Sequence, residues 1–280
     1  MISTLLSFLA LSLAHADVAA DFSEVLHSNI YHQVVLEDVL GEGSGAWDRD
    51  PRYPINTVNC MVWLQLLIEE TYAKSQPALK NQVMDRIRYF GGVVSFGTRK
   101  HFTDHWLALD GAPLKRVDLH SCLPSSAQPG QHDVDLNFRT FTKAQGYSCP
   151  LYRDDFTKQS FDYVQSKDFP ACTKALAPGH YILFAVPSTK FLNRTIKTSG
   201  PMGLVHAVVL EIQSAELARQ NGMEPRKPIV FHASTAGKHV KIENLDEFLR
   251  KSKTIHQGYA LYTLDDSWLP TAERLAQEKA

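Results

Sequence analysis

The chain has 280 residues, 44% of them hydrophobic, so it can bury a full core as one large domain or as a domain with a substantial insertion. It carries 29 basic and 30 acidic residues, a formal net charge of −1. This balance indicates no basic face for nucleic acid and no bulk electrostatic attraction to anionic lipid.

The N-terminus has the pattern of an export signal. Residues 5–13 form an apolar core of secretory length, and Ala14-His15-Ala16 offers a small-x-small cleavage site, although no Lys or Arg precedes the core. No other apolar run reaches the length of a transmembrane helix. We therefore predict a signal peptide at 1–16, a secreted or periplasmic domain at 17–270 with no stable membrane insertion, and a C-terminal tail at 271–280.

Export affects what the four cysteines can do. If Cys60 must stay free, Cys122, Cys149 and Cys172 remain, so at most one disulfide forms. Cys149 and Cys172 are one candidate pair, but their spacing alone does not decide the pairing. The sequence has no Cys-x-x-Cys pair, so we expect no zinc site built on cysteines.

The stretch before residue 56 predicts helices around 22–30 and 34–40, followed by a loop. That loop contains a glycine-rich piece at 41–45. These glycines neither follow a strand nor immediately precede a helix, so they are weak evidence for a phosphate-binding loop.

A buried helix beginning near Cys60 is the central predicted element. Asn56, Thr57 and Asn59 are candidate caps, and the run after Cys60 is apolar on nearly every face. A cysteine at a helix N-terminus meets free N–H groups and the positive end of the dipole, which favour the nucleophilic thiolate. The alternative is that Cys60 is one more small buried apolar residue.

The next elements are a second helix and a long middle segment. Apolar residues at helical spacing predict a helix over 79–87 that ends at the glycines of Tyr89-Phe90-Gly91-Gly92, and residues 93–96 suggest a short strand. Residues 111–175 are rich in Pro, Asp, Ser and Gln. We interpret the region around 107–178 as an inserted, partly irregular subdomain with a short helix at 159–165.

The last hundred residues are rich in β-forming runs, and helix returns only at 245–251, capped by Asn244. A helical half followed by an antiparallel sheet half predicts an α+β fold rather than alternating βαβ units. The predicted strands cover 181–186, 204–212, 229–232, 240–242 and 258–263.

Two histidines in these strands are candidate catalytic residues. His206 is the only polar residue in the run Leu204–Leu210, and His232 closes another strand. Each alone is as easily a satisfied core or edge histidine. Together with Cys60 they form a candidate Cys–His–His set, in which His206 takes the thiol proton and His232 orients His206.

This arrangement resembles the papain-like NlpC-type cell-wall peptidases, and within them the N-acetylmuramoyl-L-alanine amidase-like branch. The resemblance spans about residues 50–265. It is carried by five ordered stretches: Asn59-Cys60-Met61-Val62-Trp63-Leu64-Gln65, Ile87-Arg88-Tyr89-Phe90-Gly91-Gly92, the run from Arg99 to Trp106, Val205-His206-Ala207-Val208, and the run from His232 to Val240.

The resemblance implies a papain-like NlpC-type core with a sizeable middle insertion. It also implies a periplasmic amidase without cofactor or metal that cleaves the N-acetylmuramic acid–L-alanine bond of peptidoglycan fragments (muropeptides) through a thioester. The expected substrate-contacting residues are Asn59, Arg99, His101, Trp106 and Ser234, although a core role for Trp106 is equally consistent with the sequence.

Several positions depart from the family pattern. Asn59 stands where the family has Asp, Ala207 where it has Val, Val208 where it has Gly, and His105 where Asp is usual. The sequence leaves two alternatives: the same triad acting on the D-glutamyl–diaminopimelate bond, or a catalytically silent peptidoglycan-binding protein.

A metal hydrolase is a minor alternative. His101 and His105 are four residues apart, which suits zinc on a helix face. Phe102 follows His101, however, so the general-base Glu of metalloproteases is missing.

Overall fold

The computed structural model describes residues 18–29, 33–34, 57–74, 77–95, 98–100, 107, 113–137, 156–192, 204–215, 219, 227–234 and 238–268. The predicted signal peptide, the glycine-rich piece, the tail, and residues His101, His105, Trp106 and Cys149 lie outside these ranges. Within them, no helix is long and apolar enough to cross a membrane.

The first part of the chain is helical. It contains α2 (Val18–Ser28), α3 (Cys60–Ala73) and α4 (Lys80–Arg88), with 3-10 turns at Pro77–Leu79 and Phe90–Gly92. The α4 helix ends at Arg88, where Tyr89 turns to an extended conformation, so it ends just before the glycines and not at them. Gly91 and Gly92 lie in the following 3-10 turn with φ of 62° and 68°, a left-handed conformation that glycine adopts freely. Residues 93–95 are not in a strand, contrary to the prediction for 93–96.

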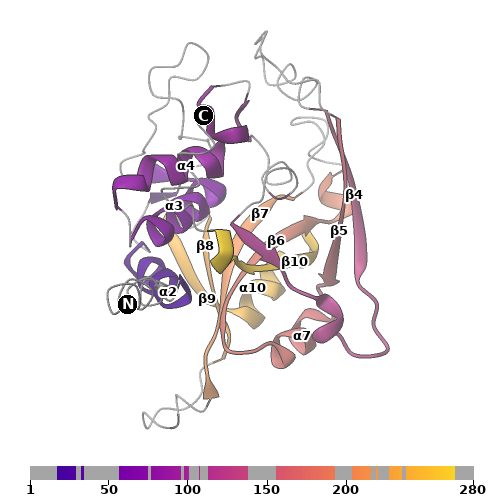
Figure 1. Ribbon diagram of the computed structural model, residues 1–280. Coiled ribbons are helices and arrows are strands. Elements are labelled where there is room, and N and C mark those ends of the chain that lie inside the picture. Colours follow the sequence, from indigo (N-terminus) through magenta and orange to yellow (C-terminus); the bar gives the residue numbers. More distant parts are fainter. Residues whose placement is uncertain are drawn as a thin grey trace, which may run out of the picture.

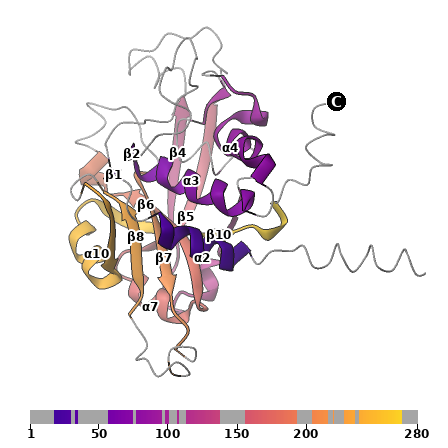
Figure 2. The same ribbon diagram turned by 90° about the vertical axis from the view of Figure 1, so that its left-hand side faces the viewer.

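An antiparallel sheet forms most of the rest of the described chain (Figures 1 and 2). Its strand order is β4-β5-β10-β6-β7-β8-β9, with β3 also paired to β10. The five strands predicted in the last hundred residues are all present, which confirms the α+β class. The strands are β3 (Leu114–Arg116), β4 (Gly130–Asn137), β5 (Phe156–Gln165), β6 (Gly179–Pro187), β7 (His206–Ile212), β8 (Ile229–Ala233), β9 (Val240–Asn244) and β10 (His256–Leu264).

Two predicted helices are wrong where the structure describes them. Residues 159–165 belong to β5, which pairs with β4 over its length and with β10 at Gly258 and Tyr259. Phe161 and Tyr163 pack in the core on one face of the sheet and Val164 packs in the core on the other face, which is the alternation of a strand. Val34, the start of the other predicted helix, lies in β1 (Gln33–Val34), paired in parallel with β2 (Thr57–Val58).

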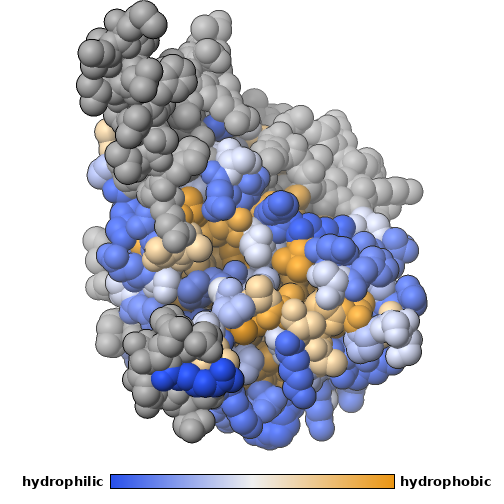
Figure 3. All heavy atoms as spheres, turned by 60° about the horizontal axis from the view of Figure 1, so that its bottom comes forward, coloured by the Kyte–Doolittle hydropathy of each residue, from blue (hydrophilic) through white to orange (hydrophobic). Residues whose placement is uncertain are grey.

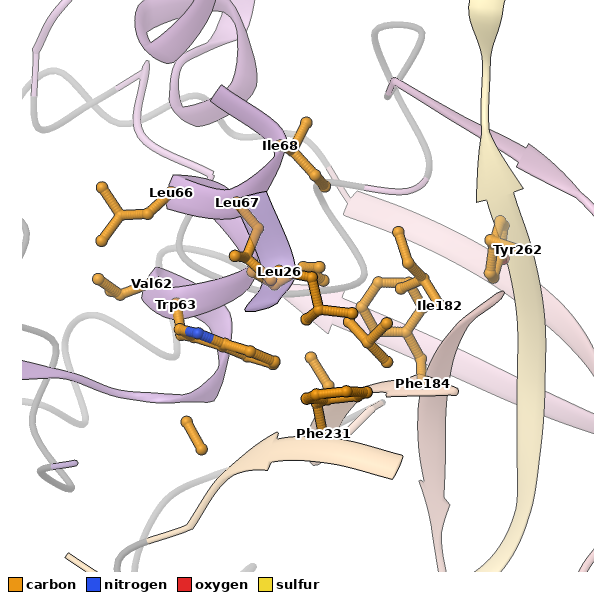
Figure 4. Close-up of a cluster of buried hydrophobic side chains, with 14 of the residues drawn as sticks. Leu26, Val62, Trp63, Leu66, Leu67, Ile68, Ile182, Phe184, Phe231 and Tyr262 are labelled. Atoms are coloured by element: carbon orange, nitrogen blue, oxygen red, sulfur yellow. The ribbon is translucent and has the colours of Figure 1, made fainter. Parts of the chain in front are cut away.

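The sheet is covered by helices on both faces. The α2, α3 and α4 helices pack on one face, and α7 (Phe169–Ala175) and α10 (Leu245–Ser252) pack on the other (Figures 1 and 2). Each face thus has its own hydrophobic core: the first core lies between the sheet and α2, α3 and α4, and the second core lies between the sheet and α7 and α10. Figure 4 shows the first core, where Trp63 and Leu67 of α3 lie near Phe184 and Phe231 of the sheet. The second face is covered by two short helices, and apolar residues remain visible from the underside of the molecule (Figure 3).

A disulfide between Cys122 and Cys172 joins the 3-10 turn at Leu119–Ser121 to α7. Both cysteines are buried in the second core, so the two elements meet there. The pairing differs from the Cys149–Cys172 candidate, because sequence spacing carries no information on which segments pack together. Cys60 is the free cysteine among the described residues.

The double variant C122S/C172S is expected to lower the free energy of unfolding by about 2–4 kcal/mol, because the bridge closes a loop with a sequence separation of 50. Urea unfolding of both proteins measures the difference. A reductant should destabilise the wild type and leave the double variant unchanged. Coincident unfolding curves for the two oxidised proteins would contradict this prediction.

The N-terminal helix α2 is tied to the sheet through a buried carboxylate. Glu211 of β7 lies 3.2 Å from Nε2 of His27 and 3.7 Å from Nε2 of His180, and Gln213 donates to it at 3.0 Å. The contact with His180 is the largest cause that lowers the pKa of Glu211 to about 2, and Gln213 and His27 add to it against the opposing effect of burial. The folded protein therefore favours the ionised carboxylate.

We expect E211Q to reduce stability at pH 7 by about 2 kcal/mol and to flatten its acid dependence. The carboxyl has a lower pKa folded than unfolded, so its contribution is complete above the unfolded value near 4.5 and is lost as the pH falls toward 2. Denaturant unfolding between pH 2 and 7 tests this. An E211Q protein with the wild-type pH slope would refute the assignment.

Candidate active site

Cys60 is the first residue of α3. Asn59 is the N-cap, and its Oδ1 accepts the Val62 N–H at 2.8 Å, as predicted for a cap. The Asn59 carbonyl accepts the Trp63 N–H at 2.9 Å, the first bond of the helix. The N–H groups of Cys60 and Met61 are among those that have no helical acceptor, so this helix end is a set of donors.

The thiol of Cys60 lies beside the backbone of β7. The N–H groups of Ala207, Met61 and Cys60 itself surround the sulfur and stabilise its thiolate, but burial has the larger effect and raises the pKa of the Cys60 thiol. The predicted preference for thiolate is therefore wrong for the resting protein, because desolvation outweighs the helix N-terminus. Cys60 rests as a thiol and needs a base to become a nucleophile.

That base can come from His206, the residue next to Ala207. The sulfur reaches the peptide N–H that links His206 to Ala207, so α3 carries Cys60 to the start of β7. Within the described residues, Cys60 and His206 share no hydrogen bond. In enzymes, the contact between a nucleophile and its base is often long without substrate and shortens when substrate binds.

The two predicted histidines meet directly. Nε2 of His206 lies 3.1 Å from Nδ1 of His232, with the rings edge to face. The sheet brings them together because β7 and β8 are antiparallel neighbours. The structure thus places Cys60 next to the β7 backbone and joins His206 to His232.

A further polar group lies behind this pair. The ring of His256, at the start of β10, stacks on His206 with the centroids 6.1 Å apart. Nδ1 of His256 is 3.2 Å from the Tyr259 hydroxyl, which is 2.8 Å from the Ser252 hydroxyl. These contacts hold His256 in place on the α10 side of the sheet.

All three imidazoles rest uncharged. Burial, with the proximity of His232, lowers the pKa of His206 to about 3, and burial with the proximity of His206 lowers the pKa of His256 to about 3. Burial and the charges of Lys241, His256 and Lys251 lower the pKa of His232 to about 4. At neutral pH His206 is therefore an unprotonated base.

The predicted substrate contacts have different outcomes. Arg99 is only 6% exposed and its backbone forms a bridge with Tyr89. Ser234 follows β8 and is half-buried, and the side-chain oxygen of Asn59 is used by the helix cap. His101 and Trp106 lie outside the described residues. Substrate contact by any of these residues stays a prediction.

Two residues of this region were missed from the sequence. Glu243 lies on β9, where His232 pairs with Lys241, so Glu243 is the diagonal neighbour of His232. His256 lies two residues before the start of the strand predicted at 258–263. A polar residue at the start of a β-rich run, as at His206, was the available signal for His256. Nothing in the sequence gives the register that brings Glu243 to His232.

Within the part of the chain that the structure describes, no group of three His, Cys, Asp or Glu side chains is arranged to hold a metal ion. The His101/His105 pair that suggested zinc lies outside that part.

A family model described as AmiA-like, N-acetylmuramoyl-L-alanine amidase-like, matches residues 26–182, more than half of the chain. The chain belongs to the AmiA-like family. The matched segment contains the Cys60 helix and ends before His206. No curated protein matches the sequence.

Solved structures share the fold at low sequence identity. A protein from Legionella pneumophila has a TM-score of 0.72 and 14% identity, over 91% of this chain and 92% of the other. An N-acetylmuramoyl-L-alanine amidase from Bacteroides uniformis has a TM-score of 0.62 and 13% identity, over 89% of this chain and 100% of the other. A second structure of an amidase from B. uniformis gives 0.56 and 14%, over 89% and 99%. At these identities the likeness concerns the fold alone.

Proposed function

We propose that this AmiA-like protein is an exported cysteine amidase that cleaves the N-acetylmuramic acid–L-alanine bond of muropeptides. The observation that carries the proposal is the 3.1 Å contact between His206 and His232, with the sulfur of Cys60 against the backbone of Ala207, the residue that follows His206. Family membership supports a hydrolase acting on peptidoglycan. The named amidase from B. uniformis supports an amide bond as its target.

The geometry supports a general-base mechanism. His206 takes the proton of the Cys60 thiol as the sulfur attacks the carbonyl of the muramic acid lactyl group. The backbone N–H groups of Cys60 and Met61, at the start of α3, donate hydrogen bonds to the oxyanion. The His206 imidazolium then protonates the leaving amine of L-alanine, and water hydrolyses the thioester with His206 again acting as base.

A Cys helix followed by antiparallel strands that carry two histidines also supports the proposed NlpC-type, papain-like placement. The disulfide between Cys122 and Cys172 supports export, because such bonds persist in oxidising compartments and are rare in the cytosol. The predicted signal peptide is the other support for a periplasmic or secreted protein.

Two observations favour a silent peptidoglycan-binding protein instead. Burial raises the pKa of the Cys60 thiol, and no hydrogen bond joins Cys60 to His206 in the described structure. A neutral thiol and a neutral imidazole with no hydrogen bond between them can catalyse the reaction only if substrate binding brings the two groups together.

Digestion of purified muropeptides by the mature protein tests the function, with the products identified by mass. Free peptide that begins with L-alanine would establish the amidase. Release of a sugar that still carries L-alanyl-D-glutamate would move the scissile bond to D-glutamyl–diaminopimelate. Binding without turnover across several muropeptides would favour the silent protein.

A further inference from the structure

His232 is held between two groups on opposite sides of its ring. Its Nδ1 lies 3.1 Å from Nε2 of His206, and its Nε2 lies 4.0 Å from Oε1 of Glu243. His232 is 6% exposed, and Nε2 is a buried nitrogen without a hydrogen-bond partner in the described structure. The Glu243 side chain is 10% exposed, so the two groups face each other out of bulk water.

The His206–His232 contact can carry its proton in two ways. If Nδ1 of His232 is protonated, it donates to Nε2 of His206, and the remaining nitrogen of His206 carries a proton that blocks it as a base. If Nε2 of His206 is protonated, it donates to Nδ1 of His232, and Nδ1 of His206 is free to accept the thiol proton of Cys60. Only the second arrangement serves the proposed chemistry.

The second arrangement requires a proton on Nε2 of His232, and Glu243 is the acceptor that faces this nitrogen. At 4.0 Å the atoms are in ion-pair range and beyond a hydrogen bond, so the carboxylate acts here mainly through its charge. A carboxylate favours an N–H over a lone pair on the facing nitrogen, because a lone pair would repel it.

The other groups around His232 make this carboxylate more important. Lys241 of β9, Lys251 of α10 and His256 of β10 all disfavour positive charge on His232. Glu243 lies 3.8 Å from the Lys241 ammonium and 3.2 Å from the Lys251 ammonium. It therefore offsets both cations where the imidazole pair must accept positive charge.

We infer that Glu243 is a positioning residue that fixes the protons of the His206–His232 pair so that His206 can accept the Cys60 proton, an inference that rests on the proposed function. During attack, the thiol proton moves to Nδ1 of His206 and the S–H bond breaks as the sulfur–carbon bond forms. Glu243 stays ionised and takes no proton. Its charge stabilises the imidazolium through His232.

E243Q is the variant that tests this, because it keeps the shape of the side chain and removes the charge. We expect kcat on muropeptide to fall roughly 10- to 100-fold with KM nearly unchanged, as for other residues that orient a catalytic group. E243D, which keeps the charge, should recover part of the lost kcat. In an H232N background, E243Q should cause little further loss, because Glu243 acts through His232.

E247Q is the matched control. Glu247 also pairs with Lys251, at 2.8 Å, but it is 48% exposed on α10 and has no contact with His232. E247Q removes a carboxylate from the same lysine and should leave kcat within about twofold of the wild type. Unfolding midpoints for both variants report whether the fold is kept.

Long-range ¹H–¹⁵N spectra of the histidines give a readout that does not depend on turnover. In the wild type, His232 and His206 should both appear as Nε2–H tautomers, and E243Q should shift His232 toward Nδ1–H. A wild-type His232 in the Nδ1–H form, or E243Q with the kcat of E247Q, would overturn the role of Glu243. A wild type that shows the expected tautomers without any turnover would instead count against the proposed function alone.

Discussion

Replacing Cys60 by alanine is expected to lower kcat/KM on muropeptide by roughly 10⁴-fold or more, because the proposed reaction has no other nucleophile. C60S should also be nearly inactive. Its hydroxyl is a poorer nucleophile in a site where His206 is the base and burial already disfavours the anion of residue 60. Product release followed by mass spectrometry measures both losses.

The fold of these variants can be checked independently of activity. Cys60 is partly exposed at the start of α3, and the cap by Asn59 does not involve its side chain. C60A should therefore unfold close to the wild-type denaturant concentration. A folded C60A that still turns over muropeptide at more than a few per cent of the wild-type rate would exclude Cys60 as the nucleophile.

H206N should lower kcat by roughly 10³-fold or more, because the thiol of Cys60 then has no base.

The wild type should keep its kcat/KM down to acid pH. The pKa of His206 is lowered to about 3, so the unprotonated base form persists until the pH approaches that value. The acid limb should thus lie well below the 6.5 of an ordinary histidine, and H206N should lack it.

H120N is the matched control for this substitution. His120 is exposed in the 3-10 turn at Leu119–Ser121, so the same change there should leave activity unaltered. Unfolding must be followed in parallel, because Glu211 titrates in the same acid range. An acid limb near pH 6.5, or an H206N protein as active as H120N, would show that His206 is not the base.

Elements with a strong local signal were predictable from the sequence. The apolar run after Cys60 with a cap at Asn59, the helix that ends just before the glycine pair, and the β-rich runs of the last hundred residues are each encoded within a few neighbouring residues. Strand β5 was predicted as a helix because its order depends on pairing with β4 and β10, which no local pattern shows. The pairing of Cys122 with Cys172 was not predictable for the same reason, because it depends on which segments pack together in the second core.

In the candidate site too, some features follow from the local sequence and others depend on how the strands pair. Residue type and position in a strand singled out His206 and His232, and the structure joins them. The register of β8 against β9 brings Glu243 to His232. The registers of β10 and β7 against β6, which lies between them, bring His256 toward His206. The protonation of Cys60 also depended on burial, because the local helix N-terminus and the surrounding protein act in opposite directions.

Acid quenching of the enzyme during turnover, followed by mass mapping of the peptide that contains Cys60, shows whether Cys60 is the nucleophile. We expect a thioester on Cys60 whose acyl group is the muramic acid sugar without any amino acid. An adduct that also carries L-alanine and D-glutamate would keep Cys60 as nucleophile and assign the other bond. Turnover with no adduct on Cys60, or with an adduct on another residue, would contradict the account.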